Sequence, residues 1–382
     1  MRVEIVDPPA YTPPYDRSLC AAIARAGADV ELVTSPFAHG EVPAASGYRV
    51  SERFYRRSAR LRAPAPVRRV AKGAGHVAGM IGFRRAARSA DVVHYQWLTA
   101  PALDAFLLPP QRPRLLTPHG WLRREGIGER APAGLRRLLD RMDAVVALSE
   151  YGAARIRDAA GVPANRVHVI PHGAFDYLTR IADPDPLPRE LGAGDRPVVL
   201  AFGLLRPYKG TELLIDALAE IADAELWVVG RPLGVDLADL RRRAAPLGDR
   251  VRFVPRFVAD REIPAIFGRA DVVALPYRDA EQSGVLYTAL AFGKPIVASD
   301  AGGFPEVAEH GAARIVPAGD AAALGQVLAE LVADPAERGR LAAGAREAAA
   351  GPYSWDRVAG RHLELYRRLL VASPAGGGTG GG

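Results

Sequence analysis

Short apolar runs rich in β-branched residues alternate with helical stretches along this chain of 382 residues, and no other feature constrains the fold as strongly. The expected strands of the first half are RVEIVD, VELVTS, DVVHYQW, RLLTPHG, AVVALSE and VHVIPHG. The stretches between them, such as SLCAAIARAG and LRRLLDRM, have helical spacing. Buried strands alternating with helices are typical of a parallel sheet covered on both faces, so the sequence predicts an α/β fold.

The alternation pauses over residues 176–197, where prolines and glycines argue against regular structure. It resumes with VVLAFG, AELWVVG, VRFVP, DVVALPY, PIVASD and ARIVPA. Ligands bind at the carboxyl ends of the strands in doubly wound sheets, so we expect two such domains facing a central cleft. The predicted segments are an N-terminal domain (1–175), a linker (176–197), a C-terminal domain (198–353), a helix crossing back to the first domain (354–372) and a flexible glycine-rich tail (373–382).

The composition is that of an ordinary globular protein, with 49% hydrophobic and 24% charged residues. A single cysteine, Cys20, rules out an intrachain disulfide, and its apolar surroundings predict a buried hydrophobic side chain. We find no signal peptide and no apolar run long enough for a membrane helix. These features predict a cytoplasmic protein, with peripheral contact at the inner face of the membrane as a further hypothesis.

Positive charge is concentrated in one segment. Residues 52–88 contain eleven arginines and lysines against the single acid Glu52, whereas the whole chain carries a net charge of +7. The basic residues between 53 and 88 indicate an anionic partner, such as an anionic membrane or a phosphorylated or lipid-linked acceptor. A solvated surface is the alternative, and nucleic acid is an unlikely partner because the segment matches no known reading module.

The first strand-to-helix junction of the second half reads FGLLRPYKGTELLIDALAEI. The strand ends at Gly203, and two cations, Arg206 and Lys209, follow in the loop. Thr211 is the expected N-cap of the next helix. Cations beside a helix N-terminus favour an anion, so this junction predicts a phosphate site.

A second junction reads YRDAEQSGVLYTALAFGKPIVASDAGG. Ser283 is the expected N-cap, and Gly284 allows close approach of a ligand to the backbone. The helix is expected to end at Gly293, because Pro295 cannot continue it. The amides of this helix N-terminus are therefore candidates for holding phosphate, and a tight turn that needs glycine is the alternative.

The pairing of GLLRPYKG with SGVLYTALAFGKPIVASDAGGFPEV resembles the retaining glycosyltransferases of family 4, the group 1 glycosyl transferases. The segments TPHG, DAVVALSEYGAARI and RVHVIPHG of the first half support the resemblance. It implies the GT-B fold, in which two Rossmann-like doubly wound domains face a central cleft. It also implies transfer of a hexose-type sugar from a nucleotide diphosphate sugar to an acceptor.

The resemblance implies a role for each matching residue. Arg206 and Lys209 would hold the diphosphate and act in catalysis, and His119 would contact the sugar near the reacting centre and also act in catalysis. The segment at His172 and Gly173 is expected to be structural. The remaining candidates are Gly203, Ser283, Gly284, Val285 and Thr288 for the nucleotide and its phosphates, and Glu281 and Gln282 for the sugar, with Glu281 also catalytic.

The sequence departs from the family pattern Glu-x7-Glu at two positions. Thr288 occupies the position of the second glutamate, and Ala280 occupies that of the first, with Glu281 next to it. A hydroxyl cannot accept hydrogen bonds from two ribose hydroxyls as a carboxylate does. The departure bears on nucleotide affinity and leaves a catalytically silent nucleotide-sugar binder open as an alternative.

We expect no metal cofactor. Asp183-Pro184-Asp185 has metal-ligand spacing, but it lies in the predicted linker. The glycines of GAGHVAG (73–79) follow no strand, which argues against a dinucleotide site. A nucleotide-sugar epimerase of the same fold is the other open alternative, because it would use the same donor without an acceptor.

Overall fold

The structure is a computed structural model that describes residues 1–37, 40, 42–56, 64–110, 113–120, 131–192, 194–221 and 223–372. It divides into two compact units, which we describe separately. Unit 1 comprises Met1–Gly173 and the segment from Trp355 onward, and unit 2 comprises Ala174–Ser354. The predicted tail (373–382) and the cations Arg57, Arg60 and Arg62 of the basic segment lie outside the described residues.

Unit 1 is built on a seven-stranded sheet with the order β3-β2-β1-β4-β5-β6-β7, in which every pairing is parallel. This order confirms the predicted doubly wound architecture. The strand β3 was not predicted, because its sequence RVSE lacks the apolar run of a buried strand. The strands are β1 (Arg2–Asp7), β2 (Asp29–Thr34), β3 (Arg49–Glu52), β4 (Val92–Tyr95), β5 (Arg114–Leu116), β6 (Ala144–Ala147) and β7 (Val167–Val169).

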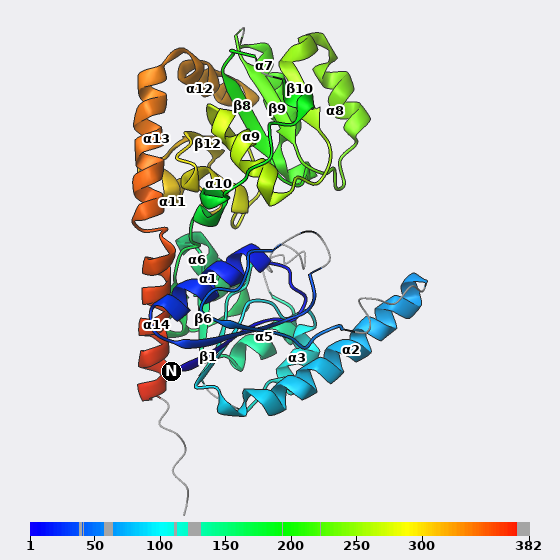
Figure 1. Cartoon of the computed structure of the whole chain (residues 1–382), viewed down its shortest axis with the longest axis vertical. Coiled ribbons are helices and arrows are strands. Elements are labelled where there is room, and N and C mark those ends of the chain that lie inside the picture. Colours follow the sequence, from blue (N-terminus) through cyan, green and yellow to red (C-terminus); the bar gives the residue numbers. More distant parts are fainter. Residues whose placement is uncertain are drawn as a thin grey trace, which may run out of the picture. The chain divides into compact units, whose positions relative to one another are not determined.

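Helices cover both faces of this sheet (Figure 1). The last helix, α14, is attached to the sheet because the Tyr366 hydroxyl bonds to His94 Nδ1 on β4 at 2.7 Å. Cys20 on α1 is fully buried, as predicted. The helices are α1 (Pro13–Arg25), α2 (Ala65–Ala86), α3 (Pro101–Leu107), α5 (Ala133–Asp140), α6 (Glu150–Ala160) and α14 (Trp355–Ala372).

Unit 2 repeats the plan with a six-stranded parallel sheet of order β10-β9-β8-β11-β12-β13. Each strand coincides with an apolar run predicted from the sequence. Trp227, the largest fully buried side chain among the described residues, lies on β9 in the core of this unit. The strands are β8 (Val198–Phe202), β9 (Glu225–Val229), β10 (Val251–Val254), β11 (Val272–Leu275), β12 (Ile296–Ser299) and β13 (Ala313–Val316).

The segment 176–197, which we predicted as a linker, lies within unit 2. Its described part forms two short 3-10 turns, and Leu178 and Leu191 are buried in the core of the unit. The helices of unit 2 are α7 (Thr211–Ala219), α8 (Leu237–Ala244), α9 (Ile263–Arg269), α10 (Gly284–Ala291), α11 (Pro305–Ala308), α12 (Ala321–Ala333) and α13 (Pro335–Ala350).

Within the described ranges, every helix is too short or too polar to cross a membrane.

Candidate active site

The two junctions predicted to bind phosphate follow neighbouring strands of unit 2, because β8 pairs with β11. Gly203, at the end of β8, has a φ of +90°, a conformation that favours glycine. A Cβ added there would lie 3.1 Å from both Lys209 Nζ and Val285 Cγ2. The loop after β8 and the first turn of α10 therefore meet at Gly203.

Lys209 is held at this edge of the sheet by two contacts. Its ammonium donates to the Phe202 carbonyl oxygen at 3.3 Å and lies 5.1 Å from the centre of the Tyr277 ring. The side chain is half-buried, which keeps the charge close to the surface of the junction. Arg206 is also half-buried and precedes the 3-10 turn Pro207–Lys209, so both predicted cations belong to one short loop.

The structure corrects the predicted cap of α7. The N-cap is Gly210 with a φ of +66°, and Thr211 is the first helical residue. A Cβ at Gly210 would lie 2.2 Å from the Pro276 carbonyl oxygen, so the loop packs directly against the end of β11. Glycine is required there by both conformation and close approach.

Ser283 occupies the N-cap position of α10, as predicted, but its side chain does not cap the helix. Its hydroxyl lies 3.2 Å from the Tyr277 hydroxyl instead. Gly284 is exposed, whereas Val285 is buried. The prediction that α10 ends before Gly293 is confirmed, since the helix closes at Ala291 and Gly293 has a φ of +58°.

Thr288, at the position of the family's second glutamate, is 5% exposed. Its hydroxyl donates to the Gly284 carbonyl oxygen at 2.9 Å, within the same helix. Glu281 and Gln282 are half-buried just before α10, and the Tyr287 hydroxyl donates to Gln282 Oε1. The three candidates therefore share one junction, with the Thr288 hydroxyl turned toward its own backbone.

Among the described residues, no group of three His, Cys, Asp or Glu side chains has the arrangement of a metal site. Asp185, from the Asp-Pro-Asp segment, pairs with Arg261 at 3.4 Å.

His119 lies in unit 1, after β5, in an aromatic setting. Its ring centre is 4.6 Å from that of Tyr15 in an edge arrangement and 5.8 Å from that of Trp97 in a stacked one. Gln96 Oε1 lies 2.9 Å from Nε2, which makes Nε2 the donor and leaves Nδ1 of the neutral ring as an acceptor. Burial, helped by the neighbouring His172, lowers the pKa of His119 to about 3, so the ring is neutral at physiological pH.

His172 is buried, and its Nδ1 donates to the Gly173 carbonyl oxygen at 2.6 Å. Its ring packs against Tyr15 and against Trp355 of α14. A Cβ on Gly173 would overlap the Trp355 ring at 2.4 Å. This segment therefore joins β7 to α14 inside unit 1.

A pH dependence follows from the neutral state of His119. Its pKa is near 6.5 in the unfolded chain and lower in the folded one, so the wild type loses stability at this site as pH falls below 6.5. His119→Asn has no such titration. We expect the stability difference between wild type and variant to narrow between about pH 7 and pH 5, measured by denaturant unfolding. A difference that stays constant with pH would show that His119 is not held neutral, since the other titrating groups are common to both proteins.

Tyr277 and Gln96 were not identified from the sequence. Tyr277 supports the Lys209 ammonium and contacts Ser283, and Gln96 orients His119. Both lie near the ends of predicted strands, DVVALPY and DVVHYQW, so their place at the strand ends was the available signal.

Two family models and several known proteins match this chain. Residues 13–173 match the family model described as Glycosyl transferase 4-like domain, and residues 196–334 match that of Glycosyl transferases group 1. The chain is 34% identical over 252 residues to a GDP-mannose-dependent alpha-(1-6)-phosphatidylinositol monomannoside mannosyltransferase of Mycolicibacterium smegmatis. That alignment covers 62% of this chain and 65% of the relative, less than two thirds of its length.

A second relative is matched over a larger share of its length. The chain is 30% identical over 313 residues to a D-inositol 3-phosphate glycosyltransferase of Xylanimonas cellulosilytica, covering 78% of this chain and 72% of that enzyme. Among solved structures, a sucrose-phosphate synthase of Thermosynechococcus elongatus superposes with a TM-score of 0.73 at 23% identity, over 98% of this chain and 100% of that one. Anabaena HepE in complex with UDP gives 0.70 at 22%, over 97% and 100%. At these identities the solved structures establish the fold, which is GT-B, and the sequence matches establish that the chain belongs to the group 1 family of glycosyl transferases.

Proposed function

We propose that this protein transfers a hexose-type sugar from a nucleotide diphosphate sugar to an acceptor, with retention of anomeric configuration. The observation that carries the proposal is the meeting of Gly203, Lys209 and Val285 at the ends of two neighbouring strands of unit 2. A cation, a glycine whose backbone a ligand can approach closely and a helix N-terminus converge there. Positive charge and backbone amides are the groups that bind the oxygens of a diphosphate.

The leaving nucleoside diphosphate gains negative charge as the glycosidic bond breaks. Lys209 and Arg206 supply positive charge to this group, and the amides of Ser283, Gly284 and Val285 donate to its oxygens. Groups fixed before the reaction stabilise developing charge without reorganisation, which is how such a junction accelerates the step.

The nucleotide is held chiefly through its phosphates in this proposal. Thr288 offers one hydroxyl where a carboxylate would offer two oxygens, and that hydroxyl already donates to the Gly284 carbonyl. Glu281 and Gln282 are the proposed ligands of the donor-sugar hydroxyls. His119, with its neutral ring, is the proposed sugar ligand from unit 1.

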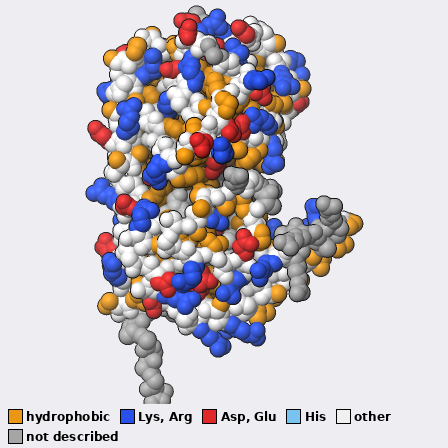
Figure 2. Space-filling view, in the orientation of Figure 1, with side chains coloured by type: hydrophobic (Ala, Val, Ile, Leu, Met, Phe, Trp, Pro, Cys, Tyr) orange, Lys and Arg blue, Asp and Glu red, His pale blue; other side chains and the backbone are white. Residues whose placement is uncertain are grey.

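The acceptor is proposed to carry phosphate, in free or lipid-linked form. The two relatives described above act on a phosphatidylinositol mannoside and on inositol 3-phosphate, according to their names. The basic segment supports this, because the first half of α2 extends away from the sheet of unit 1 (Figure 1) and its surface carries Arg and Lys beside hydrophobic side chains (Figure 2). Val67 and Val70 are 52% and 74% exposed there, which favours peripheral contact with an anionic membrane.

A transfer assay tests the function. The protein is incubated with GDP-mannose, UDP-glucose or another nucleotide sugar together with inositol 3-phosphate or phosphatidylinositol vesicles, and the product linkage is read by NMR. We expect a glycoside whose anomeric configuration matches that of the donor. Release of free nucleotide at the same rate without acceptor would favour the epimerase, and nucleotide-sugar binding without turnover would favour a silent binder.

Glu281→Ala is expected to lower kcat/KM for the donor roughly tenfold or more, because a hydrogen bond to a charged group contributes about 1.5–3 kcal/mol. The measurement is initial rate against donor concentration. Asp279→Ala is the matched control, since Asp279 is an exposed acid two residues away. Turnover of Glu281→Ala equal to that of the control would remove Glu281 from the site.

A further inference from the structure

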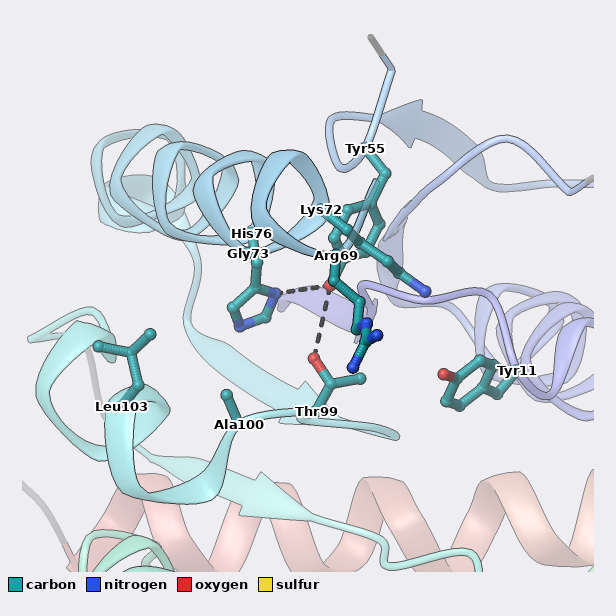
Figure 3. A pocket seen from close by; sticks show the side chains of 9 residues that line it. All are labelled: Tyr11, Tyr55, Arg69, Lys72, Gly73, His76, Thr99, Ala100 and Leu103. Atoms are coloured by element: carbon teal, nitrogen blue, oxygen red, sulfur yellow. Dashed lines mark hydrogen bonds between the residues drawn. The ribbon is translucent and has the colours of Figure 1, made fainter. Parts of the chain in front are cut away.

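A pocket of about 280 Å³ lies within unit 1, apart from the junctions of unit 2. It is bounded by α2, by the segment between β4 and α3 and by the loop after β1. Figure 3 shows the side chains that line it, and those with polar groups are Tyr11, Tyr55, Arg69, Lys72, His76 and Thr99.

A chain of hydrogen bonds forms the floor of this pocket. Asp104 is fully buried and its Oδ1 lies 2.6 Å from His76 Nε2, while its Oδ2 accepts from the Ala100 amide at 2.9 Å. His76 Nδ1 lies 2.7 Å from the Tyr55 hydroxyl, which in turn lies 3.4 Å from Thr99 Oγ1. Because a carboxylate can only accept, Nε2 donates to Asp104. The contacts with His76 and Thr99 fix the Tyr55 hydroxyl at the wall of the pocket.

The backbone of Tyr55 is strained. Its φ is +51°, in the left-handed region that residues with a Cβ rarely adopt. Burial raises the pKa of Tyr55 to about 12, so the hydroxyl stays protonated and the hydrogen bond to His76 is kept at neutral pH. Strain of this kind persists where the surroundings fix the residue and is concentrated at binding sites.

Two cations line the pocket beside this chain of hydrogen bonds. Arg69 and Lys72 are three residues apart on α2 and so lie on the same face of the helix. Both extend from the helix toward Thr99 and Tyr11 (Figure 3), and Lys72 Nζ lies 5.3 Å from the centre of the Tyr55 ring. Of the described residues that line the pocket, none carries a carboxyl group. The pocket therefore offers two cations for an anion and hydroxyl groups for a polyol.

The pocket neighbours His119. Tyr11, in its wall, lies edge-on to Trp97 with ring centres 5.3 Å apart, and Trp97 stacks on His119 at 5.8 Å. One tryptophan ring thus separates the pocket wall from the histidine proposed to contact the sugar.

We propose that this pocket binds the phosphate of a polyol phosphate, with Arg69 and Lys72 on the phosphate and the hydroxyls of Tyr55 and Thr99 on the polyol. The proposal rests on the glycosyltransferase function proposed above, since it makes this ligand the acceptor. Asp104 and His76 are positioning residues that fix Tyr55. The same chemistry is found in a free polyol phosphate and in a phosphoinositide headgroup, and the experiment below distinguishes the two.

The test compares two double variants of α2 with equal change in charge. Arg69→Ala/Lys72→Ala removes the pocket cations, and Arg84→Ala/Arg85→Ala removes two exposed cations of the same helix that do not line the pocket. The full chain is titrated with inositol 3-phosphate, with inositol and with phosphatidylcholine vesicles containing phosphatidylinositol or phosphatidylserine. Binding of GDP and UDP is measured in the same samples, because it reports the separate site in unit 2.

We expect the pocket variant to bind the phosphate-bearing probe at least about tenfold more weakly, since each cation contributes a charge-assisted hydrogen bond. The control variant is expected to stay within about twofold of wild type, and inositol alone is expected not to bind. Tight binding of inositol 3-phosphate identifies a free acceptor, and binding only to phosphatidylinositol vesicles identifies a lipid headgroup.

Three results would overturn this proposal. They are no binding of either phosphate-bearing probe by the wild type, equal losses of affinity in the two double variants, or equal binding of phosphatidylserine and phosphatidylinositol vesicles. If the wild type bound inositol 3-phosphate or phosphatidylinositol vesicles but neither GDP nor UDP, the result would instead contradict the function proposed for unit 2.

Discussion

Replacing Lys209 with alanine is expected to lower kcat by about a hundredfold or more, the effect of removing one preorganised charge donor. The ammonium is fixed between the Phe202 carbonyl and the Tyr277 ring, next to Gly203 and Val285. In the mechanism proposed above, the loss of this ammonium leaves the departing diphosphate with Arg206 and the backbone amides of α10. The measurement is kcat for sugar transfer at saturating donor.

Arg241→Ala is the matched control for this variant, because Arg241 is an exposed cation of unit 2 on α8. We expect its kcat to equal that of the wild type. Equal activity of Lys209→Ala and Arg241→Ala would show that Lys209 is part of the loop structure and not of the catalytic site.

Replacing Gly302 with alanine is expected to destabilise unit 2 by about 3 kcal/mol or more, at the severe end of single substitutions. Gly302 has a φ of +61°, and a Cβ there would lie 1.5 Å from the Ala280 carbonyl oxygen and 3.5 Å from Glu281 Cα. The turn after β12 and the loop before α10 cannot both keep their positions. We therefore expect a lower melting temperature together with a loss of activity in the protein that remains folded.

Gly319→Ala separates the two causes of this loss of stability, which are the positive φ and the close approach of an added Cβ to Ala280. Gly319 has a φ of +84°, but an added Cβ would meet nothing within 4 Å. This variant bears only the conformational cost of about 1–2 kcal/mol and is expected to keep its activity. If the two variants melted at the same temperature, the close approach of Gly302 to Ala280 would not be part of the folded protein.

The fold could be predicted from the sequence because its strands are buried on both faces. RVEIVD, VVLAFG and PIVASD are rich in Val, Ile and other apolar residues, and the stretches between them have helical spacing. The strand β3 was missed because it is short, polar and at the edge of the sheet. The segment 176–197 shows that prolines predict irregular backbone but not whether its leucines are buried.

The two strand-to-helix junctions of unit 2 could be predicted because each is a short local motif, and their binding of phosphate stays a prediction. Their details depended on contacts between distant segments, as at Ser283, whose hydroxyl bonds to Tyr277 and not to the helix. The pocket of unit 1 could not be predicted at all. Tyr55, His76 and Asp104 lie on three different elements, and in the sequence the first two stand in a basic segment whose alternative interpretation was a solvated surface.

Binding of nucleoside diphosphates is the measurement that tests the phosphate site of unit 2 most directly. Thermal shifts are recorded with UDP, GDP, ADP and dTDP for the wild type, Lys209→Ala and Arg241→Ala. A ligand present at a hundredfold excess over its Kd stabilises the folded protein by about 2.7 kcal/mol. We expect one diphosphate to raise the melting temperature of the wild type and of Arg241→Ala but not of Lys209→Ala. Equal shifts in all three proteins, or no shift with any diphosphate, would contradict the assignment of Lys209 to a phosphate site.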